Sequence, residues 1–220
     1  MQHGIAYSPE VYPLLDVCFY GQYQDDVWFR TDTLYPFETT VEQIQLDADN
    51  LIHNQRRDNV ILGRNRRTKL AWLSWGVDSK VFLLNPLTNE VGHVGNILFL
   101  DFDESKDFEG VLRKIAYLQR DGYVTTNPDI VGSGNGFHVY FYEIFDFQMI
   151  RAILKKDYIY YSLCDKFFRS TMYLKCSVLR LSERKKGNKQ PLKLLEPGYT
   201  DSEVGRLYQD FVRRCIDENL

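Results

Sequence analysis

An apolar run that ends in two aspartates constrains this chain more than any other segment. Residues 97–100 are Ile-Leu-Phe-Leu, and Asp101-Phe102-Asp103 follow directly. Four successive large apolar residues predict a buried β-strand. Because side chains alternate across a strand, Asp101 and Asp103 lie on the same face. Two neighbouring carboxylates repel each other, and a divalent metal ion held by oxygen ligands relieves that repulsion, so the strand end predicts a metal site.

A glycine-rich segment farther along the chain predicts a phosphate site. Gly132-Ser133-Gly134-Asn135-Gly136 leads into an apolar strand that begins near His138. Backbone N–H groups freed at Gly134 and Gly136 could form an anion-binding nest. The side chains of Ser133 and His138 add hydrogen-bond donors for phosphate oxygens. A metal site and a phosphate site in one chain together indicate nucleotide chemistry.

The charge balance excludes a chain-wide attraction to nucleic acid. The 220 residues carry 27 Lys and Arg against 30 Asp and Glu, a net charge of −3, so any binding to phosphates has to be local. Basic residues cluster in two stretches, and a basic run is also common on an ordinary solvated surface, so both interpretations stay open for the first stretch. The first stretch gives the candidate template contacts Arg64, Arg66, Arg67 and Lys69, and the second contains Arg180, Lys185 and Lys186.

The cysteines and the N-terminal residues indicate the cellular compartment in which we expect the protein. Cys18, Cys164, Cys176 and Cys215 are far apart, and none has a partner at metal-ligand spacing. Neither a zinc knuckle nor a disulfide scaffold is indicated. Residues 1–10 lack a basic stretch followed by an apolar one, and no stretch is long enough to span a bilayer. We therefore expect an intracellular protein, cytoplasmic in a prokaryotic host, with reduced thiols and no membrane partner.

Periodicity predicts a mixed chain of strands and helices, α/β or α+β, folded as one unit over residues 1–220. Within this unit we distinguish an N-terminal module of uncertain role, a region that carries the motifs and a C-terminal helix, at residues 1–90, 91–195 and 200–218. Helices are expected at residues 40–54, at 106–121 with Ser105 as the cap, at 147–169 with a break near Asp157, and after Thr200-Asp201-Ser202-Glu203. Strands are expected at residues 60–62, 70–75, 80–84, 96–100 and 177–181.

Three segments taken in order resemble the motifs of the archaeo-eukaryotic primase superfamily. They are Leu100-Asp101-Phe102-Asp103, Gly132-Ser133-Gly134-Asn135-Gly136-Phe137-His138 and Val178-Leu179-Arg180-Leu181. Members of this family carry an acid-x-acid strand end, a Ser-x-His-type strand after glycines, and a third acid, often near a Leu-Arg-Leu strand. The resemblance covers about residues 95–190. It implies an RRM-like catalytic sheet packed with a second small α/β module.

The resemblance also implies an activity, the template-dependent synthesis of primers or strands from nucleoside triphosphates on single-stranded DNA. Asp101 and Asp103 would bind two Mg²⁺ or Mn²⁺ ions, which activate a 3′-hydroxyl for attack on the α-phosphate. His138 would contact the incoming triphosphate. A replicative helicase and a single-stranded-DNA-binding protein of a plasmid or virus would be partners. Other residues of the nucleotide site would be Ser133, Gly134, Gly136, Arg180 and Lys185.

The third acid of the family has no obvious counterpart in this chain. Residues 171–176, which precede the Leu-Arg-Leu strand, contain no carboxylate. Asp165 is the best substitute and would complete the catalytic, metal-binding set, while Glu183 and Asp157 are weaker candidates. Without a third acid, the same fold would serve as a noncatalytic, RRM-like nucleic-acid-binding replication subunit. It would stack bases on exposed aromatic side chains such as Tyr140 and Tyr142.

Each motif alone also has another interpretation. Asp103 or Ser105 would serve as the cap of the following helix, and Gly134-Asn135-Gly136 as the turn of a hairpin. Asp101-x-Asp103-x-Ser105 after an apolar strand also fits the nucleophile motif of haloacid dehalogenase-like phosphatases, in which Asp101 would be phosphorylated. That class needs a later acidic pair, and the chain has no convincing one, so the phosphatase is the less favoured enzyme class.

Overall fold

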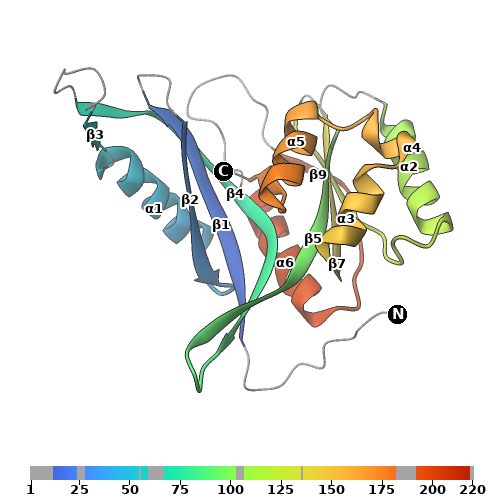
Figure 1. The fold of residues 1–220 in the computed structure, drawn as a ribbon, viewed down its shortest axis with the longest axis horizontal. Coiled ribbons are helices and arrows are strands. Elements are labelled where there is room, and N and C mark those ends of the chain that lie inside the picture. The colour runs from blue at the N-terminus through green and yellow to red at the C-terminus, as the bar shows by residue number, and fades with distance from the viewer. Residues whose placement is uncertain are drawn as a thin grey trace.

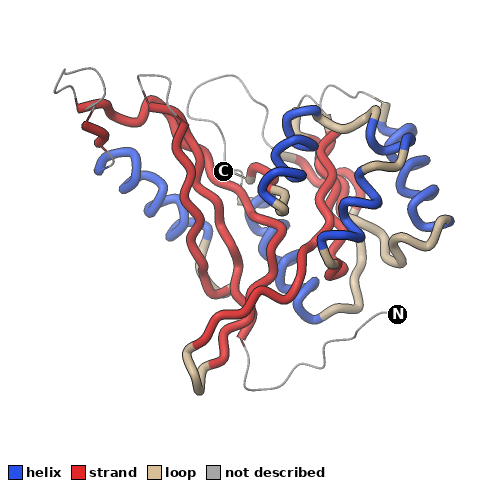
Figure 2. The backbone as a smooth tube through the Cα atoms, in the orientation of Figure 1, coloured by secondary structure: helices blue, strands red, loops and turns tan. Residues whose placement is uncertain are grey.

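The computed structural model describes residues 12–23, 28–54, 56–58, 67–102, 107–134, 136–181 and 192–218, and their side chains outside residues 52–72. These residues form a mixed α/β fold with an open antiparallel sheet and six helices (Figure 1, Figure 2). The strands are β1 (Tyr12–Tyr23), β2 (Trp28–Pro36), β3 (Arg56–Asp58), β4 (Arg67–Asn85), β5 (Glu90–Phe102), β6 (Asp129–Gly132), β7 (Phe137–Phe145), β8 (Val178–Arg180) and β9 (Lys193–Glu196). The helices are α1 (Val41–Asn54), α2 (Phe108–Arg120), α3 (Phe147–Leu154), α4 (Asp157–Tyr160), α5 (Asp165–Leu174) and α6 (Glu203–Asp217).

The sheet runs in the order β2-β1-β4-β5-β7-β6-β9, and β3 and β8 each pair with β4. β4 is the longest strand, with 19 residues. It pairs with β5 only beside their shared turn, from Asn85↔Glu90 to Lys80↔Asn96. Beyond that point β8 pairs with β4 at residues 76–78, and β5 pairs with β7. The sheet therefore divides into a β2-β1-β4 wing and a β5-β7-β6 wing (Figure 1).

Gly76 is required where β8 lies against β4. Gly76 pairs with Arg180, and a Cβ at this position would collide with the backbone carbonyl of Leu179. Glycine in a strand interior commonly marks such a close approach of another backbone. The β4–β8 contact thus fixes the position of Arg180, one of the predicted nucleotide-binding residues.

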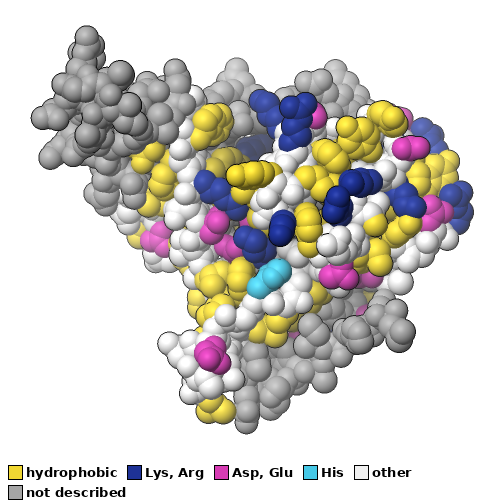
Figure 3. Space-filling view, viewed as in Figure 1, with side chains coloured by type: hydrophobic (Ala, Val, Ile, Leu, Met, Phe, Trp, Pro, Cys, Tyr) yellow, Lys and Arg dark blue, Asp and Glu magenta, His cyan; other side chains and the backbone are white. Residues whose placement is uncertain are grey.

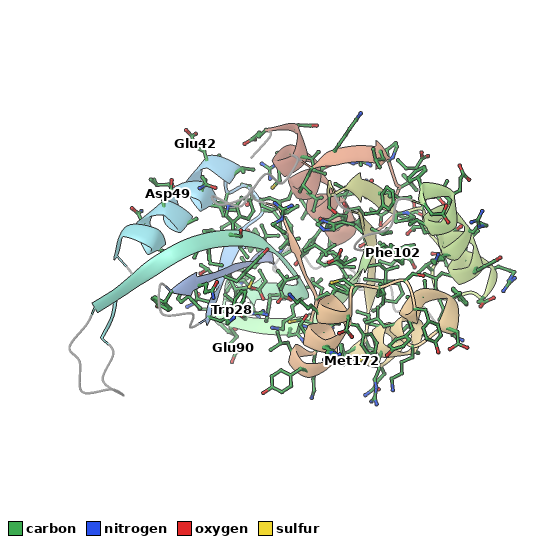
Figure 4. All side chains as sticks on the ribbon, turned by 90° about the horizontal axis from the view of Figure 1, so that it is seen from above. Trp28, Glu42, Asp49, Glu90, Phe102 and Met172 are labelled. Atoms are coloured by element: carbon green, nitrogen blue, oxygen red, sulfur yellow. The ribbon has the colours of Figure 1, made fainter. Side chains whose placement is uncertain are left out.

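Helices cover both faces of the β5-β7-β6 wing. α2 covers one face, since the rings of Phe108 and Phe137 lie 5.6 Å apart. Ring contacts join α4 to α2 and α5 to α4, so these helices belong to the same layer. α6 lies on the opposite face, where Arg213 forms an ion pair with Asp129. Figure 4 shows α5, which carries the labelled Met172, and α6 on opposite sides of the sheet.

α1 covers the β2-β1-β4 wing with one apolar stripe. Val41, Ile44 and Ala48 are buried and recur at helical spacing. Trp75 of β4 donates its indole N–H to Gln45 of α1 at 3.1 Å. The core is continuous between the two wings, because the buried residues of α1, the sheet and the other helices form one cluster.

Several expected elements are confirmed and others need correction. α1 and α6 match their expected ranges, and the strands expected at residues 70–75 and 80–84 are one strand, β4. α2 is capped by Asp107, which accepts from the N–H of Gly110 at 2.8 Å, so the cap expected at Ser105 was wrong. The hairpin of β1 and β2 was not expected, and the strand expected at residues 60–62 lies outside the described residues.

The helix expected at residues 147–169 is three helices, α3, α4 and α5. The break near Asp157 is confirmed, but a second interruption precedes Asp165. Both aspartates lie in the first turn of a helix, where the helix dipole favours a carboxylate. Apolar periodicity missed only the second start, at Asp165, because it continues through residues 161–169. Within the described residues, no helix combines the length and the apolar content needed to cross a membrane.

Replacing Gly76 with alanine should destabilise the protein by about 1–3 kcal/mol, because the added methyl group forces β8 away from β4. Gly92→Ala is the matched control, since a Cβ at Gly92 meets no atom within 4 Å, and its effect should stay within about 0.5 kcal/mol. Urea denaturation followed by circular dichroism measures both free energies of unfolding. Equal effects of the two substitutions would contradict the close β4–β8 approach.

Candidate functional site

Asp101 and His138 lie opposite each other on neighbouring strands. The register of β5 with β7 pairs Asp101 with His138, and directly paired residues of an antiparallel sheet share a face. The distance from His138 Nε2 to Asp101 Oδ1 is 3.8 Å. Both side chains are largely buried, with exposed fractions of 7% for His138 and 16% for Asp101. The two predicted motifs therefore meet at one point of the sheet.

Tyr140 lies on the same face of β7 and restricts the imidazole ring. Its hydroxyl is 3.5 Å from His138 Nδ1, so the ring has Tyr140 at one nitrogen and Asp101 at the other. Burial raises the pKa of Tyr140 well above its usual range, and the charge of Asp101 adds to the rise while Arg180 opposes it. The phenol is therefore neutral, and Arg180 is close enough to act electrostatically on this part of the face.

An ion pair between a buried aspartate and a half-buried arginine holds α6 against this same face. Asp129 of β6 is fully buried and accepts from Arg213 at 2.8 Å. The hydroxyl of Tyr142 donates to the same carboxylate at 3.0 Å, and the rings of Tyr140 and Tyr142 stack with centroids 6.3 Å apart. A continuous line of side chains thus connects the Asp129–Arg213 pair with His138. Tyr140 and Tyr142 are fully buried in this line, so the expectation that they are exposed for base stacking was wrong.

The glycine-rich segment is the turn of a hairpin between β6 and β7. The N–H of Ser133 donates to the Gly136 carbonyl at 3.0 Å. Gly134 has a φ of +86°, a conformation that favours glycine. The hairpin interpretation is therefore confirmed. The N–H of Ser133 is engaged within the turn, so the anion-binding nest predicted from the sequence would depend on Gly134 and Gly136.

The backbone beside Asp165 contacts the backbone of Asp101, but the Asp165 carboxylate forms an ion pair at the protein surface. The N–H of Cys164 donates to the Asp101 carbonyl at 2.8 Å. Asp165 Oδ2 forms an ion pair with Arg169 at 2.8 Å, and both side chains are exposed. Among the described residues, no group of three or more His, Cys, Asp or Glu side chains is arranged to hold a metal ion. This geometry favours a surface role for Asp165 over that of a third ligand.

The other predicted site residues lie on β8, on β4, or outside the described part of the chain. Arg180 is buried on β8. Arg67 and Lys69 belong to β4, where they pair with Asp58 and Arg56 of β3. Six candidate residues lie outside the described part of the chain: Arg64, Arg66, Asp103, Glu183, Lys185 and Lys186.

A second cluster of charged residues, which was not predicted, lies on β1, β2 and β4. Arg30 of β2 donates to Asp78 of β4 at 3.0 Å, and Asp78 is fully buried. Asp16 of β1 is also buried, and its Oδ1 has no hydrogen-bond partner among the described residues. The charges of Asp32 and Lys80 lie near enough to shift the pKa of Asp16. In the sequence, Asp16 has apolar residues on both sides, and this pattern was the signal that could have indicated a buried carboxylate.

This cluster gives the stability of the protein a defined pH dependence. Burial raises the pKa of Asp16 to about 7, and the charges of Asp78 and Asp32 add to the rise while Lys80 and Arg30 oppose it. An aspartate in an unfolded chain has a pKa of about 3.9. Between these two values the folded state holds a proton that the unfolded state has lost. The contribution of Asp16 to the free energy of unfolding therefore falls as the pH rises from about 4 to about 7.

The substitution Asp16→Asn should remove this fall, because the amide stays neutral at every pH. At pH 8 we expect the variant to be more stable than the wild type by roughly 1–4 kcal/mol. Urea denaturation at a series of pH values between 4 and 8 measures the difference. The same pH dependence in both proteins would show that Asp16 is not protonated in the folded state.

Comparison with known proteins supplies no further constraint on this site. No family model, no curated protein and no solved structure matches the chain. A function for the chain therefore has to be inferred from the Asp101–His138 pair and the residues around it.

Proposed function

We propose that the chain is a primase-polymerase-like nucleotidyltransferase that joins nucleoside triphosphates on a single-stranded DNA template. The observation that carries the proposal is the position of Asp101 across from His138, with 3.8 Å between carboxylate and imidazole. A carboxylate at a strand end suits a divalent cation. An imidazole beside it suits the phosphates of a nucleotide bound to that cation, because its N–H groups donate to phosphate oxygens.

The connections of the β5-β7-β6 wing support the same family. β5, α2, β6, β7, the helices α3 to α5, and β8 follow one another in the βαββαβ order of an RRM-like unit, and β7 lies between β5 and β6. Asp101 and His138 belong to the face away from α2, and RRM-type sheets bind their ligands on the sheet. β8 pairs with β4 and so joins the β2-β1-β4 wing to this unit.

The donor groups fit Mg²⁺ or Mn²⁺. Proteins commonly hold Mg²⁺ by one or two carboxylates together with substrate phosphates, without a complete protein cage. Asp101 is such a carboxylate, and Asp103 follows two residues later in the sequence. When bound, two such ions would activate a primer 3′-hydroxyl and stabilise the leaving pyrophosphate. His138 and Arg180 would hold the triphosphate by charge-assisted hydrogen bonds. A replicative helicase and a single-stranded-DNA-binding protein are the proposed partners, in plasmid or viral replication.

A noncatalytic nucleic-acid-binding subunit is the second candidate. Two observations favour it: the described residues contain no three-group metal cluster, and the carboxylate of Asp165 pairs with Arg169. The two candidates differ in whether DNA binding is accompanied by metal-dependent synthesis.

The substitution Asp101→Asn should lower nucleotide incorporation by about 100-fold or more, because the amide lacks the negative charge that would bind the catalytic cation. The assay measures incorporation of labelled ribonucleotides and deoxynucleotides on single-stranded DNA with Mg²⁺ or Mn²⁺, with and without a primer. Asp165→Asn is the matched control, and we expect it to retain most of the activity because its ion pair lies at the surface. Salt-sensitive DNA binding with no synthesis under any condition would contradict the polymerase and favour the noncatalytic subunit.

A further inference from the structure

The helices α3 to α5 present an outer surface that the Asp101–His138 site does not use. α4 and α5 join α2 through ring contacts, so this layer covers the face of the wing opposite to His138. Figure 3 views this side of the molecule and shows Lys and Arg side chains interspersed with apolar ones over α3 to α5. We call the exposed surface of residues 147–175 the α3–α5 surface.

The α3–α5 surface is positively charged, although the whole chain is acidic. Residues 147–175 contain six Lys and Arg and two Asp, a local net charge of +4, whereas the complete chain carries −3. Most of these cations are exposed, among them Arg151, Lys155, Lys166 and Lys175. A local concentration of positive charge on an acidic protein favours a polyanionic partner at this surface.

Two of the most exposed aromatic rings of the described residues lie on the same surface. Tyr161 is 81% exposed and Tyr173 is 86% exposed. Tyr160 is 42% exposed, and its ring contacts both Tyr161, at 5.2 Å, and Phe168 of α5, at 4.8 Å. The aromatic side chains thus begin at the end of α4 and continue along α5.

The spacing of residues along α5 places charged and aromatic side chains on the same face of the helix. Lys166, Arg169 and Tyr173 are separated by three and four residues and so lie on one face of the helix, while Phe167 and Thr171 are buried on the other. Arg169 is held by Asp165 in an exposed ion pair. Such a pair contributes little stability, so a phosphate group can replace the carboxylate without a large cost.

We propose that the α3–α5 surface binds single-stranded nucleic acid, with bases stacked on Tyr161 and Tyr173 and phosphates bound by Lys166 and Lys175. Exposed rings that alternate with cations match the two parts of a single strand, because every base has a face that stacks and every nucleotide carries a phosphate. An acidic peptide would use the cations alone and would leave both rings without a role. The inference extends the proposed function by giving the nucleic acid a second surface, and it depends on that function only for the choice of DNA as the probe.

Fluorescence anisotropy with a labelled oligothymidylate tests this inference. Each of Tyr161→Ala and Tyr173→Ala should raise the Kd by at least about 5-fold, the loss expected for one stacked base. Tyr161→Phe and Tyr173→Phe should bind as the wild type does, because phenylalanine keeps the stacking ring. Tyr12→Ala is the matched control, since Tyr12 is an exposed tyrosine on β1, and its Kd should not change.

Charge substitutions give an independent measure. Lys166→Gln together with Lys175→Gln should reduce the slope of log K against log salt concentration by about 1.4, which corresponds to two lost phosphate contacts on a single strand. Binding is measured without Mg²⁺, Mn²⁺ or nucleoside triphosphates, so failure of the polymerase proposal and failure of this one are distinguishable. Absence of binding, or unchanged binding by the tyrosine-to-alanine variants, would overturn the inference. Binding of poly-glutamate that the lysine substitutions weaken, without binding of DNA, would assign the surface to an acidic protein and overturn it as well.

Discussion

The pairing of β4 with β5 runs from Asn85↔Glu90 to Lys80↔Asn96 and ends there. From that point the two strands have different neighbours, because β8 lies against β4 and β7 lies against β5. Gly76 allows the first of these contacts, and a register shift between Ile97 and Leu98 accompanies the second. Asp101 lies opposite His138 because β7 pairs with β5 along residues 96–102, the part of β5 that begins where its pairing with β4 ends.

The end of β5 connects the two surfaces to which we assign functions. On one face of the sheet Asp101 lies opposite His138. Tyr142 and the ion pair of the buried Asp129 with Arg213 hold α6 over the rest of that face. On the other side, the N–H of Cys164 donates to the Asp101 carbonyl, and α5 begins at the next residue. A strand of nucleic acid bound along α5 would therefore lie on a helix whose N-cap residue, Cys164, is hydrogen-bonded to the backbone of Asp101, the proposed metal-binding residue.

The sequence was informative where apolar pattern and chemistry coincide, and less so where they conflict. The run that ends at Asp101 predicted a buried strand, and the structure contains it as the second half of β5. β1 and β2 were not predicted, because a buried Asp16 interrupts the apolar pattern of β1 and most side chains of β2 are exposed or half-buried. The pairing of Asp101 with His138 required the register of β5 with β7, which no local pattern encodes. The ion pair of Asp165 with Arg169, by contrast, joins residues four apart on one helix, a spacing that can be found in the sequence.

The most direct test of the central claim is to locate Mn²⁺ in crystals soaked with Mn²⁺ and a nonhydrolysable nucleoside triphosphate, by anomalous scattering. Mn²⁺ within roughly 2.2 Å of an Asp101 carboxylate oxygen, a distance typical of small divalent cations, with the triphosphate against His138, is the predicted result. Mn²⁺ bound elsewhere, for example beside Asp16 and Asp78, or a nucleotide bound without contact to His138, would contradict the assignment of this strand end as the catalytic site.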